Sequence, residues 1–216
     1  MSDDLIFREV DEDLREDRYR ELWRRWGRWI IAAAALVVVA TAATVAWQDW
    51  QAGQRAADSA RFDVAARQAT EGATAEALTA FEALAANGGT GYAMLARLRE
   101  ASLHAAGGDA AKAVAALDAI AADGGVPQLY RDLATLLAAL QGLETQDPTA
   151  TRARVAPLTA ETSPWRFTAR EISALAALRQ GDRAAARELY QSLVDDQAAP
   201  QGLRGRAARM AAALAG

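Results

Sequence analysis

The longest hydrophobic stretch of the chain lies near its N-terminus. The sequence from Ile30 to Trp47, IIAAAALVVVATAATVAW, contains no charged side chain. At about 1.5 Å per residue, a helix of this length approaches the roughly 30 Å thickness of the hydrocarbon core of a bilayer. Indole rings favour the headgroup layer, and four tryptophans flank the stretch: Trp26, Trp29, Trp47 and Trp50. The pattern predicts a transmembrane helix over residues 29–48, with these tryptophans at the two membrane interfaces.

Positive charge is concentrated before this stretch. Residues 18–28 hold five arginines, whereas residues 49–68, a longer segment, hold three. Because arginine-rich flanks stay in the cytoplasm, we expect a single-pass protein of a bacterial inner membrane with its C-terminal domain in the periplasm. One alternative is a signal peptide cleaved near residues 40–42, but the nine acidic residues within 1–28 disfavour it. The other is a buried core helix, which seldom has paired tryptophans at both ends.

Residues 1–28 are expected to form a cytoplasmic amphipathic segment. Ile6, Val10 and Leu14 recur every four residues, which would place them on one face of a helix. Acidic residues also stand four positions before arginines, as in Glu16 and Arg20, a spacing that stabilises helices. Two roles stay open for this segment: resting on the inner leaflet, or docking onto a cytoplasmic or membrane partner.

Beyond Trp50, stretches rich in alanine and leucine alternate with short turns at a period of roughly 36 to 37 residues. Gly108 and Gly181 are each followed by Asp, and Pro127 and Pro200 stand at the same offset after them. Halving the distance between the two glycines predicts further turns at Gly72 and near residue 145. A small residue follows each turn by five positions, at Ala77, Ala113, Ala150 and Ala186. Nine positions after the turns stand Phe81, Leu117, Arg154 and Tyr190.

A small residue at a close helix crossing, a larger one a turn later and a closing proline suit stacked helical hairpins. These residues resemble the tetratricopeptide repeat, although Arg97 and Arg170 replace the large aromatic residue of its first helix. The expected fold is therefore all-α: one transmembrane helix followed by a tetratricopeptide-like solenoid over residues 49–216. We expect about four hairpins and a C-terminal capping helix, with an unrelated helical bundle as the alternative.

Composition excludes several classes of function. The net charge of −4 and pI near 5.2 argue against a nucleic-acid partner, and the absence of cysteine excludes disulfides and thiolate chemistry. His104 is the single histidine, and no second histidine or cysteine could join it in a metal site. We predict that His104 is a packed or surface residue of a helix, without a catalytic role. No phosphate-binding or nucleophile motif is present. We therefore expect that the protein is not an enzyme and that it binds no cofactor, metal or small-molecule substrate.

Stacked hairpins instead offer a surface for protein partners. Arg97 stands one period after Arg61, and Arg170 stands two periods after Arg97, which predicts equivalent places in different hairpins. A recurring arginine could bind carboxylates or peptide carbonyls, or could simply face solvent. The candidate partner-binding residues are these arginines and the residue after each: Arg61, Phe62, Arg97, Leu98, Arg170 and Glu171.

The layout as a whole is similar to that of the ancillary subunit family of the bacterial Sec translocon. An acidic and arginine-rich segment from Phe7 to Arg28, one span bounded by tryptophans, and an alanine-rich repeat domain carry the resemblance, together with the stretch LARLREA at residues 95–101. The resemblance implies a non-enzymatic scaffold that links the translocon to periplasmic chaperones, including a membrane-anchored prolyl isomerase. A repeat scaffold for another envelope assembly, such as cell-wall synthesis or division, is the alternative.

Overall fold

The computed structural model describes the backbone of residues 3–215 and the side chains of residues 23–215. Within this range the regular elements are all helical, which confirms the predicted all-α class. The chain divides into two units, one up to Gln54 and one from Arg55 onward. The helices are α1 (Asp3–Thr70), α2 (Thr74–Asn87), α3 (Thr90–Ala106), α4 (Ala110–Ala122), α5 (Gln128–Gly142), α6 (Pro148–Val155), α7 (Arg166–Arg179), α8 (Arg183–Asp195) and α9 (Gln201–Ala213), with a 3-10 turn, η1 (Ala156–Thr159), after α6.

The first unit consists of the N-terminal part of α1. From Trp23 onward, α1 contains a stretch long and apolar enough to cross a membrane, and none of that stretch is buried against other described residues. All four predicted interface tryptophans are exposed, and the rings of Trp47 and Trp50 lie 5.1 Å apart. The predicted apolar face of Ile6, Val10 and Leu14 falls on side chains outside the described ones.

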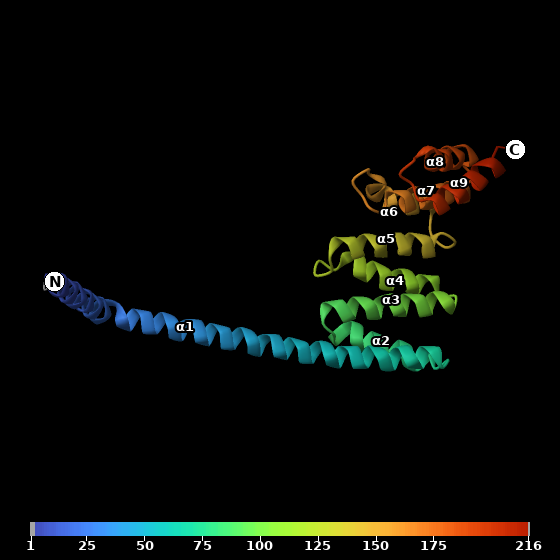
Figure 1. Cartoon of the computed structure of the whole chain (residues 1–216). Coiled ribbons are helices and arrows are strands. Elements are labelled where there is room, and N and C mark those ends of the chain that lie inside the picture. The colour runs from blue at the N-terminus through green and yellow to red at the C-terminus, as the bar shows by residue number, and fades with distance from the viewer. Residues whose placement is uncertain (1–2, 216) are drawn as a thin grey trace. The chain divides into compact units, whose positions relative to one another are not determined.

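The second unit is a stack of helical hairpins, in which consecutive helices from α2 to α5 lie side by side (Figure 1). Three of the four predicted turns fall on glycines with left-handed backbone: Gly72, Gly108 and Gly181, with φ of 85°, 80° and 83°. After each glycine, the next backbone N–H donates to a carbonyl five residues earlier, as Asp109 does to His104 at 2.8 Å. This is the Schellman ending of a helix, for which glycine is favoured because it lacks a Cβ.

The aspartate after the turn begins the second helix of three hairpins. The carboxylate of Asp109 accepts from the backbone N–H of Lys112 at 3.0 Å, and that of Asp182 accepts from Ala185 at 2.9 Å. Asp147 caps α6 in the same way, through the N–H of Thr149 at 3.1 Å, and Pro148 occupies the first turn. The turn predicted near residue 145 therefore leads into a helix that begins at Pro148 with Asp147 as its cap.

The third hairpin departs from the predicted register by one residue. The period predicts Ala150 at the helix crossing and Arg154 at the bulky position, but Ala150 is exposed and Arg154 is half-buried. Thr151 and Val155 are fully buried instead. Counting from the capping aspartate explains the difference, because Asp147 precedes Thr151 by four residues, as Asp109 precedes Ala113. The predicted turn near residue 145 is therefore one position too early.

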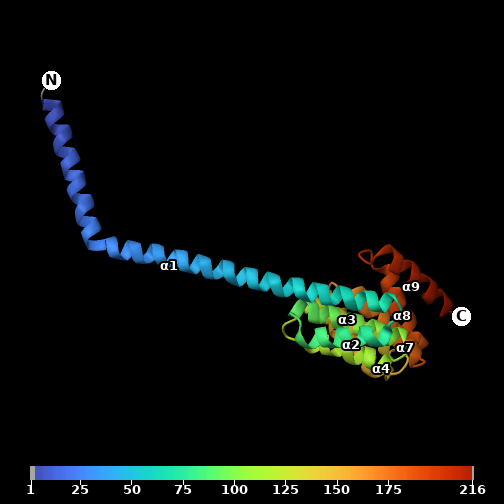
Figure 2. The same ribbon diagram turned by 90° about the horizontal axis from the view of Figure 1, so that it is seen from below.

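The other three hairpins keep the predicted packing. Ala77, Ala113 and Ala186 are fully buried, as are the larger Phe81 and, to within 2%, Leu117 and Tyr190. Four hydrophobic clusters follow one another along the stack, each built from neighbouring elements: α1 to α3, α3 to α5, α5 to α7, and α7 to α9. Figure 2 shows the stack from below, with α9 beside α8 at its C-terminal end. Since each core is local, stability is distributed along the array.

Candidate interaction surfaces

In two of its three positions the recurring arginine pairs with an aspartate that follows the second helix of its own hairpin. Arg97 of α3 donates to Asp123 at 3.1 Å, and Arg170 of α7 donates to Asp196 at 3.2 Å. The two arginine side chains are only 25% and 21% exposed, so a purely solvent-facing role does not describe them. Both aspartates directly follow the second helix of the hairpin. Each pair therefore ties the first helix to the loop that leaves the second.

The aspartates of these pairs also organise the loops themselves. Asp123 accepts from the backbone N–H of Gly125 at 2.9 Å, and Asp196 accepts from that of Ala198 at 3.0 Å. The Gly125 N–H, and after it the Arg97 guanidinium, lower the pKa of Asp123 below its ordinary value. Arg97 and Arg170, which stand two periods apart in the sequence, therefore make equivalent hydrogen bonds to equivalent aspartates.

Arg61 differs from the other two. Its side chain is 64% exposed and lies 3.4 Å from Asp58, which also accepts from the backbone N–H of Gly89 at 2.9 Å. The aspartate partners of Arg97 and Arg170 each stand 26 residues after the arginine. The residue at that distance after Arg61 is Asn87, which carries no charge. Arg61 is therefore the most exposed of the three arginines, and its guanidinium donates to Asp58 within α1 rather than to a loop aspartate.

The other predicted partner-binding residues serve the packing of the array. Phe62 lies edge-on to Phe81, with ring centroids 5.4 Å apart, and Leu98 packs against the cluster of α3 to α5. Glu171 accepts two hydrogen bonds of 3.0 Å from Arg206, joining α7 to α9. Contact of these residues with a partner stays a prediction, and their intrachain contacts leave them less free for it than Arg61.

A cleft of about 650 Å³ lies beside Arg61, on the first hairpin. Alanine and valine side chains form most of it: Val64 of α1 is 45% exposed, and Ala60 and Ala83 are also exposed. The lining residues are Ala60, Arg61, Val64, Ala80, Ala83, Leu84 and Asn87. Within this second unit no earlier hairpin covers the face, so small apolar side chains stay open to solvent beside one cationic group.

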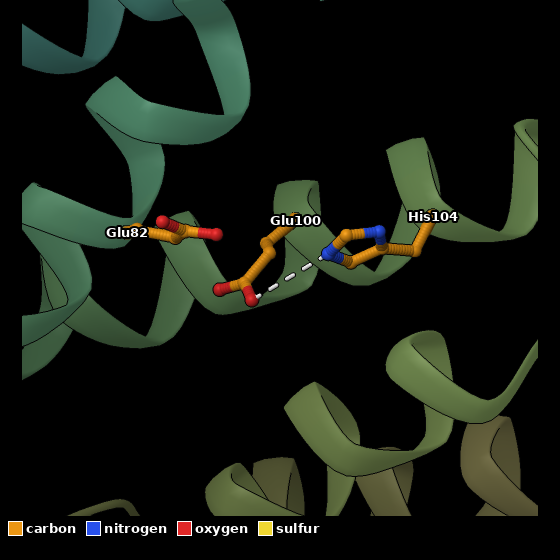
Figure 3. A group of neighbouring side chains, drawn as sticks. All are labelled: Glu82, Glu100 and His104. Atoms are coloured by element: carbon orange, nitrogen blue, oxygen red, sulfur yellow. Dashed lines mark ion pairs between the residues drawn. The ribbon is translucent and has the colours of Figure 1, made fainter. Parts of the chain in front are cut away.

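A second cleft, of about 470 Å³, is formed by α2, α3 and α4. Glu82 of α2 faces Glu100 and His104 of α3 across it (Figure 3). The His104 Nε2 atom lies 3.8 Å from Glu100 Oε1, and their side chains are 10% and 19% exposed. Burial, followed by repulsion from Glu82, raises the pKa of Glu100 above its ordinary value.

The two cations in this second cleft are engaged elsewhere. Arg97 pairs with Asp123, and Lys112 lies 3.3 Å from Asp109. From the sequence, His104 is predicted to pack as a helix residue, and no contact with Glu82 or Glu100 is predicted. The four-residue spacing of Glu100 and His104 is a usable signal, whereas Glu82 joins them only through the packing of α2 on α3.

The chain matches the family described as the tetratricopeptide repeat-like domain over residues 20–210, and it belongs to that family. The matched region includes the apolar stretch of α1 as well as the hairpins. No curated protein matches the chain, and no solved structure does. Tetratricopeptide-like repeats are typical of scaffolds for protein interaction, which sets the class of function.

Proposed function

We propose that this chain is a non-enzymatic, membrane-tethered scaffold that holds periplasmic chaperones, a prolyl isomerase among them, near the Sec translocon. The exposed apolar cleft of the first hairpin carries the proposal. It offers Val64 and the surrounding alanines as an exposed apolar floor, with Arg61 at its side, in a fold class that serves protein interaction. A partner segment with small apolar residues and one carboxylate would complement it.

The tether in this proposal is the apolar part of α1. Its length and exposure suit a lipid environment, and the arginines before it favour a cytoplasmic N-terminus. The proposed organisation is a cytoplasmic segment over residues 1–28, a span over 29–48, and a periplasmic repeat domain over 49–216. A reporter that is active only in the cytoplasm, fused after Gly216, should be inactive, and activity would reverse this topology.

The resemblance in layout to the ancillary subunits of the Sec translocon supports the choice of partner. A scaffold for cell-wall synthesis or division would use the same class of surface, so the two are separated by the identity of what binds. We therefore place a photo-crosslinking amino acid at Val64 in the full-length chain and recover the products from cells after detergent solubilisation. A matched probe at Glu188, exposed on α8, controls for chance encounters.

Translocon subunits and periplasmic chaperones should cross-link from position 64 in preference to position 188. The substitution Ala83→Glu puts a charge on the exposed floor of the cleft and should abolish these products, whereas Ala184→Glu on the exposed face of α8 should not. Recovery of division or cell-wall enzymes instead would replace the proposed partner. Equal labelling from both positions would remove the cleft as the docking site.

A further inference from the structure

We infer that Glu82, Glu100 and His104 form a binding site for one divalent transition-metal ion, with Zn²⁺ as its representative. Carboxylate oxygen and imidazole nitrogen are ordinary ligands of Zn²⁺, and three protein ligands with one open position is a common zinc arrangement. The inference is independent of the proposed docking of chaperones, because it concerns a different cleft and has its own measurement.

The geometry of the three groups supports it. One ligand atom from each residue lies within 4.8 Å of those from the other two. Tetrahedral zinc with bonds of about 2.0–2.2 Å places its ligands about 3.3–3.6 Å apart. The separation of 3.8 Å between Glu100 and His104 is already close to this range. Glu82 is exposed on α2, so rotation of its side chain can supply the remaining shift.

Helix placement fixes two of the ligands before any ion arrives. Glu100 and His104 stand four residues apart on α3 and therefore on one face of it. Both side chains are largely buried, which limits their rotamers. Glu82 comes from the neighbouring helix, so an ion would join α2 to α3. Such a bridge between packed helices is stabilising because the site does not exist in the unfolded chain.

Charge also favours an ion at this place. Two glutamates converge in a partly buried cleft, and the cations of that cleft already pair with Asp123 and Asp109. A divalent cation would offset both negative charges and leave the fourth position for water or for a partner's side chain.

The test is zinc binding to the full-length chain in detergent micelles, purified through a tag without histidine. Competition with a chromophoric zinc chelator gives the affinity and the stoichiometry. We expect one saturable site per chain. Glu82→Gln and His104→Gln should each weaken binding by at least about tenfold, since even the loss of groups that only orient ligands costs about 10- to 100-fold. Glu76→Gln, on the exposed first turn of α2, is the matched control and should bind as the unchanged chain does.

The single histidine supplies a second measurement. His104 is the only histidine of the chain, so its ring signals in an NMR spectrum need no assignment. They should shift with zinc and reach a plateau at one equivalent. Unchanged ring signals, or equal affinities for Glu82→Gln and Glu76→Gln, would overturn the site. If His104→Gln loses helicity by circular dichroism, the exposed Glu82→Gln variant and the ring signals decide the question.

Discussion

Replacement of Phe81 by alanine tests whether the hairpins are stabilised locally. Phe81 is fully buried in the cluster of α1, α2 and α3, among Ala65, Ala77 and Ala96, which are also fully buried. A Phe→Ala change in a core costs about 3–5 kcal/mol, and the cost is higher where neighbours cannot fill the space. Alanines have no side-chain torsion with which to do so. Larger side chains of the same cluster, such as Leu84 and Phe62, can fill part of the space, so we expect a loss of about 4 kcal/mol, within this range.

The loss of stability should be confined to the N-terminal end of the repeat array. In stacked repeats each unit contacts only its neighbours, so a cavity in the first hairpin destabilises α2 and the C-terminal part of α1 first. Since each step of about 1.4 kcal/mol is a factor of ten, amide hydrogen exchange there should accelerate about a thousandfold. The amides of α8 and α9, which pack in a separate cluster, should keep their rates.

Hydrogen exchange followed by mass spectrometry on the full-length chain in detergent measures both effects. Leu95→Ala is the control, because this side chain of α3 is 40% exposed and its removal leaves no enclosed cavity. Acceleration below about tenfold in α2 would refute the claim that the surrounding alanines cannot refill the space. Equal acceleration in α8 would show that the array unfolds as one unit, contrary to the local clusters.

Three further predictions concern a turn, a loop carboxylate and the apolar helix. Gly108→Ala should destabilise the chain by about 1–2 kcal/mol because its φ of 80° is left-handed, whereas Gly124→Ala, with open space and no such φ, should be nearly neutral; equal melting temperatures would contradict this. The lowered pKa of Asp123 means that its ionised form stabilises the fold above the ordinary pKa near 3.8, and that this contribution is lost as the pH falls through the lowered value. The melting temperature of Asp123→Asn should accordingly lie below that of the unchanged chain at pH 7 and converge with it below about pH 4, and a constant gap down to pH 3 would exclude the assignment. Val38→Arg, at the centre of the apolar stretch, should cost about 2.5–3.5 kcal/mol of membrane insertion and reduce the fraction that resists alkaline extraction, while Val38→Leu should not; equal fractions would argue against a span.

The period of the repeat could be predicted because turn chemistry is local. A glycine with left-handed φ acts within a few residues, so Gly72, Gly108 and Gly181 are visible in the sequence as turns, and an aspartate that caps the next helix follows two of them, Gly108 and Gly181. The third turn carries no glycine, and its register depends on Asp147, which caps α6. Arithmetic from the neighbouring glycines predicts Ala150 and Arg154 where the structure buries Thr151 and Val155.

The candidate surfaces were less accessible to sequence reasoning. Regular spacing correctly placed Arg97 and Arg170 in equivalent positions, but it could not show that an aspartate after the second helix accepts from each of them. Such a pair depends on how the second helix returns along the first. The same holds for Arg61, where Asn87 stands at the position of the loop aspartates and the guanidinium pairs with Asp58 instead.

Local hydrophobic pattern and turn residues were sufficient, by themselves, for the helical class, the apolar stretch of α1 and three of the four turns, because these depend on neighbours within a turn or two of helix. Tertiary structure alone decided which charges pair, which cleft stays open and which side chains meet across helices. Glu82 reaches His104 only because α2 packs on α3. Packing between helices brings together residues whose separation in the chain carries no periodic signal, and Glu82 joins the proposed metal site in this way.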